Sequence, residues 1–303
     1  MSPQDNLKIK KEAVLTGHAN PIYSLCEAYD EHIIFSAGGD KMVAAWNLKA
    51  FKGENFSIQF EQAIYTVFYD KETGILYAGN AIGGIHVIDL NIKKEIKLLQ
   101  NHNKAIFDIK KIDNTLVVAS ADGHVSFTDL KEHKAFKITK ICSQKVRQIH
   151  IDELEKKIYF AAGDCSVRIF ESENFSQEKI IGVHDLSCNS VIINPNNRDI
   201  LSGGRDAHIN IVDKNFEQKK NIAAHNFAVY DFAFSPNKKL MATASRDKTI
   251  KIWDAENYDI LKRIDRLAGG HRNSVNRVLW TSFNDYLIST GDDGQIIIWS
   301  IGE

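Results

Sequence analysis

Short runs of apolar and β-branched residues alternate with turn-forming residues along the whole chain. The clearest stretch has such runs at residues 230–234, 240–244 and 249–254, followed by a fourth run at 258–264. Runs of this length, separated by segments rich in Ser, Pro, Asn and Asp, predict a strand–turn–strand pattern. We expect four antiparallel strands in one small twisted sheet, both faces of which need cover from neighbouring sheets.

The same pattern recurs at a nearly constant interval. Seven times a strand closes on an aromatic or aliphatic residue, once replaced by Thr, followed by a polar residue: Trp46-Asn47, Ile88-Asp89, Thr128-Asp129, Phe170-Glu171, Val212-Asp213, Trp253-Asp254 and Trp299-Ser300. These landmarks are 42, 40, 42, 42, 41 and 46 residues apart. A period of about 40–45 residues is typical of propeller blades. The repeat predicts one all-β domain over residues 1–303, with blades ending near 46, 88, 128, 170, 212, 253 and 299.

Composition narrows the class of protein. The chain has 38 Lys and Arg against 39 Asp and Glu, which gives a net charge of −1. A general polyanion binder carries a basic excess, so this balance disfavours nucleic acid as a partner. Residues 1–11 are polar and lysine-rich, without the apolar core of a secretory signal. No apolar run approaches the roughly 18 residues of a membrane span. We therefore expect a cytoplasmic protein without a membrane partner.

The cysteines support the same expectation. Cys26, Cys142, Cys165 and Cys188 lack the CxxC spacing of redox or metal sites. We expect these cysteines to be small apolar residues of strands, in a protein of a reducing compartment.

Three of the periods carry a His, a Ser or Thr, an Asp and a Trp at fixed spacing. The sets are His18, Ser36, Asp40 and Trp46; His225, Thr243, Asp247 and Trp253; and His271, Ser289, Asp293 and Trp299. Ser, His and Asp together suggest a hydrolase triad, but a nucleophile rarely recurs in one domain at a constant interval. An indole N–H can donate to the hydroxyl, and the imidazole can link that hydroxyl to the carboxylate. We therefore expect structural hydrogen-bond networks, and no catalytic or metal site among these residues.

With these residues and spacings, the chain resembles the WD-repeat family of β-propellers across nearly its whole length. The resemblance rests on Gly17-His18 with Trp46-Asn47, on Gly270-His271 with Trp299-Ser300, and on the recurring His-to-Trp separation of 28 residues. It implies a seven-bladed β-propeller of four-stranded antiparallel sheets, with the His–Ser/Thr–Asp–Trp sets as structural tetrads. It also implies that an N-terminal strand, at about residues 8–15, pairs with the last blade and closes the ring.

Four periods depart from this pattern. The second has Phe60, Ile82 and Ile88 at the His, Asp and Trp positions, and the fourth has Cys142 and Phe170 beside Asp164. The third keeps His102 and Asp122 but has Thr128, and the fifth keeps His184, Ser202 and Asp206 but has Val212. We expect the second, third and fourth blades to rely more on apolar packing and to have looser loops.

The family resemblance also points to one face of the ring. It implies that residues three and five after each His, and the residue before the Asp, lie near the central channel. In the second and fourth periods, which lack the His, the count starts from Phe60 and Cys142. The predicted partner-binding residues are then Tyr23, Tyr65, Phe107, Lys145, Arg147, Asn189, Arg205, Tyr230, Arg246 and Asn276. Tyr23, Tyr65 and Phe107 form an aromatic arc, and Lys145, Arg147, Arg205 and Arg246 form a basic arc. Tyr and Arg are over-represented at binding hot spots, although aromatic residues at these positions also serve as packing residues that cap the channel.

The function predicted from these features is a non-enzymatic scaffold that binds a protein or peptide on the channel face. The partner would carry an apolar or aromatic anchor beside an acidic or phosphorylated group. One alternative is an enzyme with its site at the channel mouth. Another is a nucleic-acid or nucleosome-binding module that uses the basic arc. We expect no cofactor and no metal, and a monomer in isolation, since a closed ring has no free sheet edge.

Overall fold

The computed structural model describes residues 7–302. Residues 1–6 and 303 lie outside the described part, so the predicted domain bounds of 1–303 extend slightly beyond it. The described residues form 28 strands. Within residues 7–302 no helix is long and apolar enough to cross a membrane.

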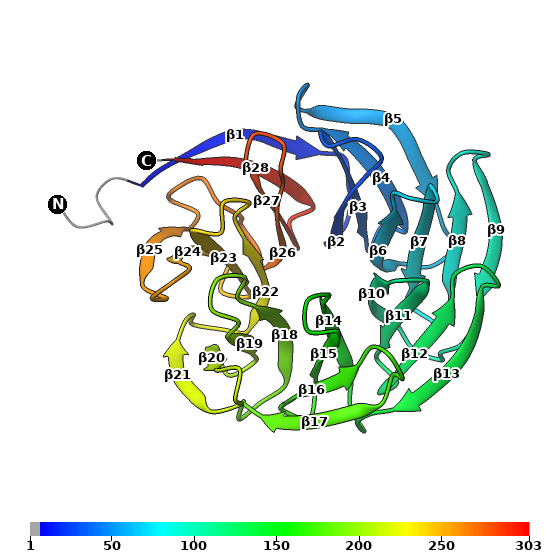
Figure 1. The fold of residues 1–303 in the computed structure, drawn as a ribbon. Helices are drawn as coiled ribbons and strands as arrows, with labels where there is room; N and C mark the ends of the chain where they lie inside the picture. Colours follow the sequence, from blue (N-terminus) through cyan, green and yellow to red (C-terminus); the bar gives the residue numbers. More distant parts are fainter. Residues whose placement is uncertain (1–6, 303) are drawn as a thin grey trace.

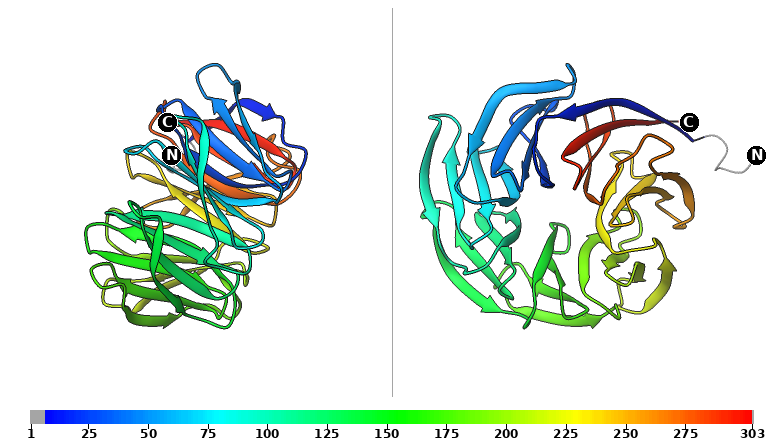
Figure 2. Two further views of the ribbon diagram at one scale, coloured as in Figure 1. Left: turned by 90° about the vertical axis from the view of Figure 1, so that its right-hand side faces the viewer. Right: turned by 180° about the vertical axis from the view of Figure 1, so that it is seen from behind.

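The strands form seven sheets of four antiparallel strands each, arranged in a ring (Figure 1). Figure 2 shows the ring edge-on and from behind. We number the sheets as blades 1 to 7, each with its innermost strand first. The strands are β2 (Ile22–Glu27), β3 (Ile33–Gly38), β4 (Met42–Asn47) and β5 (Lys52–Gln59) in blade 1; β6 (Ile64–Asp70), β7 (Ile75–Asn80), β8 (Ile85–Asp89) and β9 (Lys94–Leu99) in blade 2; β10 (Ile106–Ile112), β11 (Thr115–Ser120), β12 (His124–Asp129) and β13 (Lys134–Lys140) in blade 3; β14 (Val146–Asp152), β15 (Lys157–Ala162), β16 (Ser166–Glu171) and β17 (Gln177–Gly182) in blade 4; β18 (Cys188–Ile193), β19 (Ile200–Gly204), β20 (His208–Val212) and β21 (Gln218–Ala223) in blade 5; β22 (Val229–Phe234), β23 (Leu240–Ser245), β24 (Ile250–Asp254) and β25 (Ile260–Ile264) in blade 6; and β26 (Val275–Trp280), β27 (Leu287–Gly291), β28 (Gln295–Gly302) and β1 (Lys8–Thr16) in blade 7. The seven-bladed all-β propeller predicted from the repeat is confirmed.

The two ends of the chain close the ring. β1 pairs antiparallel with β28, from Lys8 opposite Gly302 to Thr16 opposite Gln295, with a bulge between Lys11 and Ala13. The two strands lie side by side at the rim of blade 7 (Figure 1). The predicted pairing of residues 8–15 with the last blade is therefore confirmed. Because β1 runs directly into blade 1, the same pairing joins the first blade to the last.

The core lies between neighbouring blades, because side chains along each strand point alternately to the two faces of the sheet. In β28, Ile297 and Trp299 pack with residues of blade 6, whereas Ile296 and Ile298 pack with residues of blade 1. All four side chains are buried. Successive side chains of a strand point to opposite faces of its sheet, so one short strand contributes to two cores. This packing holds the blades side by side and fixes the position of their inner ends.

Candidate functional site at the channel mouth

The inner strand of every blade has a β-bulge at the same place. In blade 1, Ile22 pairs with Gly38 and Ser24 pairs with Ala37, so that Tyr23 is the extra residue. The same shift occurs in the other six blades, and the seven extra residues are Tyr23, Tyr65, Phe107, Arg147, Asn189, Tyr230 and Asn276. A bulge leaves one residue outside the ladder and redirects its side chain. These residues are the seven predicted from the position five residues after the His, or after Phe60 and Cys142 where the His is missing.

All seven side chains converge on one pocket of about 160 Å³. The pocket lies at the mouth of the central channel, and Arg277 is its eighth lining residue. The structure therefore brings together seven of the ten predicted site residues. Lys145, Arg205 and Arg246 are exposed and do not line the pocket itself.

One side of the pocket is an aromatic wall made of Tyr23, Tyr65 and Phe107. The rings of Tyr23 and Tyr65 stack with centroids 4.7 Å apart and planes 3° apart, and Phe107 meets Tyr65 edge-on at 5.6 Å. Such offset and edge-to-face contacts are the preferred arrangements of aromatic pairs. All three residues are half-buried, and burial raises the pKa of Tyr23. The wall is thus rigid before any partner arrives.

The opposite side is basic, and its central residue is Arg147. The guanidinium of Arg147 lies 5.7 Å from the ring centroid of Phe107, and Lys145 lies 5.8 Å from the same centroid. Burial lowers the pKa of Arg147, and the charge of Arg205 lowers it further. The basic side therefore meets the aromatic wall through cation–π contacts.

The two asparagines of the ring have structural partners. Asn189 donates a hydrogen bond to the carbonyl of Val229 at 3.2 Å, which links blade 5 to blade 6. Asn276 donates to the carbonyl of Ile22 at 2.9 Å and to the carboxylate of Asp292 at 2.8 Å. These contacts hold the pocket together at the seams between blades, so the amide groups are largely occupied.

Sequence reasoning missed Arg277, which forms the floor of the pocket. It belongs to a second ring, one residue after each bulge, that is polar in all seven blades: Ser24, Thr66, Asp108, Gln148, Ser190, Asp231 and Arg277. The signal that would have found it is this unbroken polar position at the start of otherwise apolar strands.

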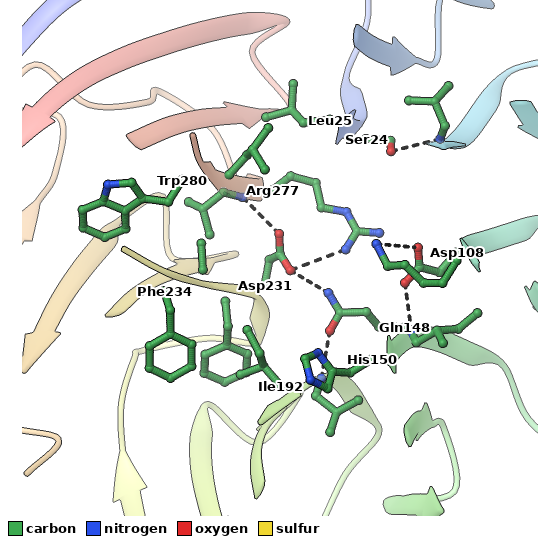
Figure 3. A pocket seen from close by; sticks show the side chains of 18 residues that line it. Ser24, Leu25, Asp108, Gln148, His150, Ile192, Asp231, Phe234, Arg277 and Trp280 are labelled. Atoms are coloured by element: carbon green, nitrogen blue, oxygen red, sulfur yellow. Dashed lines mark hydrogen bonds and ion pairs between the residues drawn. The ribbon is translucent and has the colours of Figure 1, made fainter. Parts of the chain in front are cut away.

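Four residues of the second ring tie their blade to the next beneath the pocket. The backbone N–H of Val67 donates to Ser24 at 3.1 Å, and those of Ile149, Val191 and Val278 donate to Asp108, Gln148 and Asp231 at 2.9, 2.8 and 3.1 Å. Below the mouth these side chains line a channel cavity of about 290 Å³. In Figure 3, Arg277 extends into this cavity toward Asp231, with a closest N···O distance of 3.5 Å.

The predicted tetrads form continuous networks in blades 1, 6 and 7. In blade 6, Trp253 Nε1 donates to Thr243 Oγ1 at 2.9 Å, His225 Nε2 lies 2.8 Å from the same oxygen, and His225 Nδ1 lies 3.0 Å from Asp247. The corresponding contacts of blade 1 measure 2.7, 2.6 and 2.8 Å, and those of blade 7 measure 3.0, 2.9 and 2.9 Å. The three hydroxyl residues are fully buried, so a substrate has no access to them.

A comparison with known protein families finds matches in blades 1, 6 and 7. The sequence profile of the family described as WD domain, G-beta repeat matches residues 9–47, 216–254 and 262–300. These three segments are the ones that contain the complete tetrads, and each runs from the outer strand of one blade into the next. These matches support assignment of the chain to the WD-repeat family.

A curated WD-repeat relative shows a weaker similarity. The DENN domain and WD repeat-containing protein SCD1 of Arabidopsis thaliana is 21% identical over 159 residues. The aligned stretch covers 52% of this chain and 13% of that protein. The similarity thus concerns only a small part of the relative.

Blades 3 and 5 keep the histidine and the aspartate of the tetrad. In blade 3, His102 lies 3.2 Å from Asp122 and 2.9 Å from Ser126, a residue of the third strand. In blade 5, His184 lies 3.0 Å from both Asp206 and Ser202.

Blades 2 and 4 have no histidine at the tetrad position and use other polar groups. Asn80 accepts hydrogen bonds from the N–H groups of Ile82 and Gly84 at 3.0 and 2.9 Å. Asp164 pairs with Ser166 and with Arg168. The turns of these blades are therefore hydrogen bonded, and the expectation of looser loops stays a prediction.

The side chains that could bind a metal ion, and the cysteine thiols, are dispersed over the described part of the structure. Within residues 7–302, no three His, Cys, Asp or Glu side chains lie close enough together to hold a metal ion. All four cysteines are free thiols. Cys26 and Cys188 lie in strands as expected, whereas Cys142 and Cys165 lie in turns.

Proposed function

We propose that this protein is a non-enzymatic interaction module whose channel-mouth face binds a partner protein or peptide. Proteins of the WD-repeat family typically serve as interaction scaffolds. The observation that carries the proposal is the two-sided pocket, with an aromatic wall on one side and cations on the other. A partner with an apolar or aromatic anchor beside an acidic or phosphorylated group complements both sides.

The size of the pocket supports a protein ligand over a small-molecule substrate. Ligand and cofactor sites usually measure about 300–1,000 Å³, and the mouth pocket measures about 160 Å³. It therefore suits a single side chain of a larger partner. The exposed cations Lys145, Arg205 and Arg246 extend the surface around it, as a rim around a central anchor does in protein interfaces.

The test is a combined Tyr23→Ala, Phe107→Ala and Arg246→Ala variant. It removes two rings and one rim cation, while the interblade hydrogen bonds of Asn189 and Asn276 remain. We expect a folded protein that loses its partners in affinity purification followed by mass spectrometry. Recovery of the same partners in undiminished amounts would exclude this face.

A matched control changes three exposed residues on the opposite face. Tyr29 lies in the β2–β3 turn, and Lys49 and Phe51 lie in the β4–β5 turn. We expect the Tyr29→Ala, Lys49→Ala and Phe51→Ala variant to keep the partners. Loss of partners from this variant alone would move the interface to the opposite face.

We further propose that the protein acts as a cytoplasmic monomer. The four free thiols support a reducing compartment. The pairing of β1 with β28 supports a self-contained ring without an unpaired strand at its junction. Sedimentation at micromolar concentration and cell fractionation test the two statements separately.

A further inference from the structure

The mouth pocket has the volume of a single aromatic ring. A cavity of about 150 Å³ in the interior of another protein takes up benzene, and this pocket measures about 160 Å³. Its wall of Tyr23, Tyr65 and Phe107 offers ring faces and edges, which aromatic side chains contact most favourably. The shape and chemistry of the pocket therefore suit the ring of a tyrosine or phenylalanine from a partner.

Within the described residues, the arginines on the basic side of the pocket are not paired with carboxylates. Among residues 7–302, no carboxylate forms an ion pair with Arg147, Arg205 or Arg246. Arg147 uses only its Nε in a hydrogen bond, to Ser187 Oγ at 3.3 Å, so its two terminal amino groups remain available. By contrast, Arg168, Arg198 and Arg277 each pair with an aspartate.

The three unpaired arginines act electrostatically on Tyr230, which lines the pocket together with Arg147. Burial raises the pKa of the Tyr230 hydroxyl, and the charges of Arg246, Arg147 and Arg205 act in the opposite direction; the Asp292 carboxylate, which accepts a hydrogen bond from Asn276, also raises it. Arg147 and Arg205 are also close enough to repel each other, since the charge of Arg205 lowers the pKa of Arg147. Like charges at this distance are costly without an anion between them.

Building on the proposed function, we propose that the mouth pocket binds a phosphotyrosine side chain of the partner. The ring lies against the aromatic wall, and the phosphate lies among Arg147, Arg205 and Arg246. A phosphate carries nearly two negative charges at neutral pH and three acceptor oxygens, which matches several guanidinium groups better than one carboxylate does. Arginine also contacts phosphate through two parallel hydrogen bonds.

The experiment measures binding of purified protein to peptides by fluorescence polarisation. The probe is a degenerate peptide pool with a fixed central phosphotyrosine, and the comparison is the same pool with unmodified tyrosine. We expect the phosphorylated pool to bind at least about tenfold more tightly, because hydrogen bonds between charged groups are the strong ones. Phenyl phosphate, as a free aryl phosphate, should compete, and inorganic phosphate should compete much more weakly.

Variants assign the binding to the pocket. Arg147→Gln should weaken binding of the phosphorylated pool by about tenfold. Arg147→Lys should restore only part of that loss, because lysine lacks the planar guanidinium that donates two parallel hydrogen bonds. Arg263→Gln, an equal charge change on the outer strand β25, should leave binding unchanged. Thermal melts establish that each variant is folded.

Three outcomes overturn the inference. Equal binding of the unmodified pool would show that the ring alone is recognised, and tighter binding of a peptide with a C-terminal aromatic residue would assign the arginines to a carboxylate. Absence of binding to either pool would remove the phosphotyrosine assignment. In each case the affinity purification with the triple alanine variant still decides separately whether this face docks a partner.

Discussion

Gln148 of blade 4 and Asp231 of blade 6 are hydrogen bonded across the channel, with Nε2 and Oδ1 2.6 Å apart (Figure 3). Blade 5 lies between their blades in the ring. Gln148 also accepts the N–H of Val191 in blade 5, and Asp231 accepts the N–H of Val278 in blade 7. One pair of side chains thus connects four blades beneath the mouth pocket.

The first prediction concerns this connection. Gln148→Ala should lower the free energy of unfolding by about 1–3 kcal/mol, since the N–H of Val191 loses its acceptor and Asp231 loses a donor. Gln144→Ala, an exposed neighbour in the preceding loop, is the control and should change stability by less than about 0.5 kcal/mol. Urea denaturation measures both. Equal effects would mean that the cross-channel bond contributes nothing.

The second prediction concerns closure of the ring. Removal of residues 1–15 takes away most of β1 and leaves β28 as an exposed edge strand. We expect the melting temperature to fall by about 10 °C or more, because a shift of about 2–4 °C accompanies each kcal/mol in a domain of 150–250 residues. A variant that lacks only residues 1–6 is the control and should melt like the full chain. An unchanged melt of the longer truncation would refute the closure.

The third prediction compares two buried threonines. Thr243 accepts the indole N–H of Trp253 and contacts Nε2 of His225, so Thr243→Val leaves these two nitrogen atoms without their partner. We expect a loss of about 2–4 kcal/mol in the free energy of unfolding. Thr128 is also buried, and its hydroxyl has no hydrogen-bond partner among residues 7–302.

The matched change Thr128→Val should therefore be neutral or slightly stabilising, because it replaces an unsatisfied hydroxyl with a methyl group of similar shape. Chemical denaturation of both variants gives the comparison directly. A larger loss from Thr128→Val than from Thr243→Val would contradict the role assigned to the tetrad.

The fourth prediction concerns pH. Burial lowers the pKa of His102, His184 and His225 below the ordinary value of 6.5, so the folded state favours their neutral forms. The stability from these groups is complete above pH 6.5 and is lost as the pH falls below it, because the unfolded chain then binds more protons. We expect urea midpoints to decrease from about pH 6.5 downward.

The aspartates extend this decrease to lower pH. Burial alone would raise the pKa of Asp247, but the hydrogen bonds from His225, Thr249 and the N–H of Asn226, with the charge of His225, together hold it below its ordinary value of 3.8. Its contribution is present above pH 3.8 and is lost on further acidification. His225→Asn should flatten the decrease near pH 6, whereas His32→Asn, on the surface beside Asp30, should not. A profile that is flat between about pH 7 and pH 5 would contradict this assignment.

The sequence by itself determined the blades, because each blade is built from neighbouring segments. A strand pairs with the next strand along the chain, so turn residues and alternation fix the sheet locally. The spacing from His225 to Trp253 was enough to predict a network whose members all lie in one blade. The family resemblance, applied in the same phase, assigned Tyr23 and Arg147 to one face before their contacts were known.

Only the tertiary structure decided which of these side chains interact. Gln148 and Asp231 are 83 residues apart, and closure of the ring brings them together although no local pattern relates them. Ser126 replaces a missing tetrad hydroxyl from a different strand, and Arg277 reaches the pocket floor from the ring below the bulges. The repeat determines the position of each residue within its blade. The contacts of that residue depend on the residues of other blades, and the period does not determine those residues.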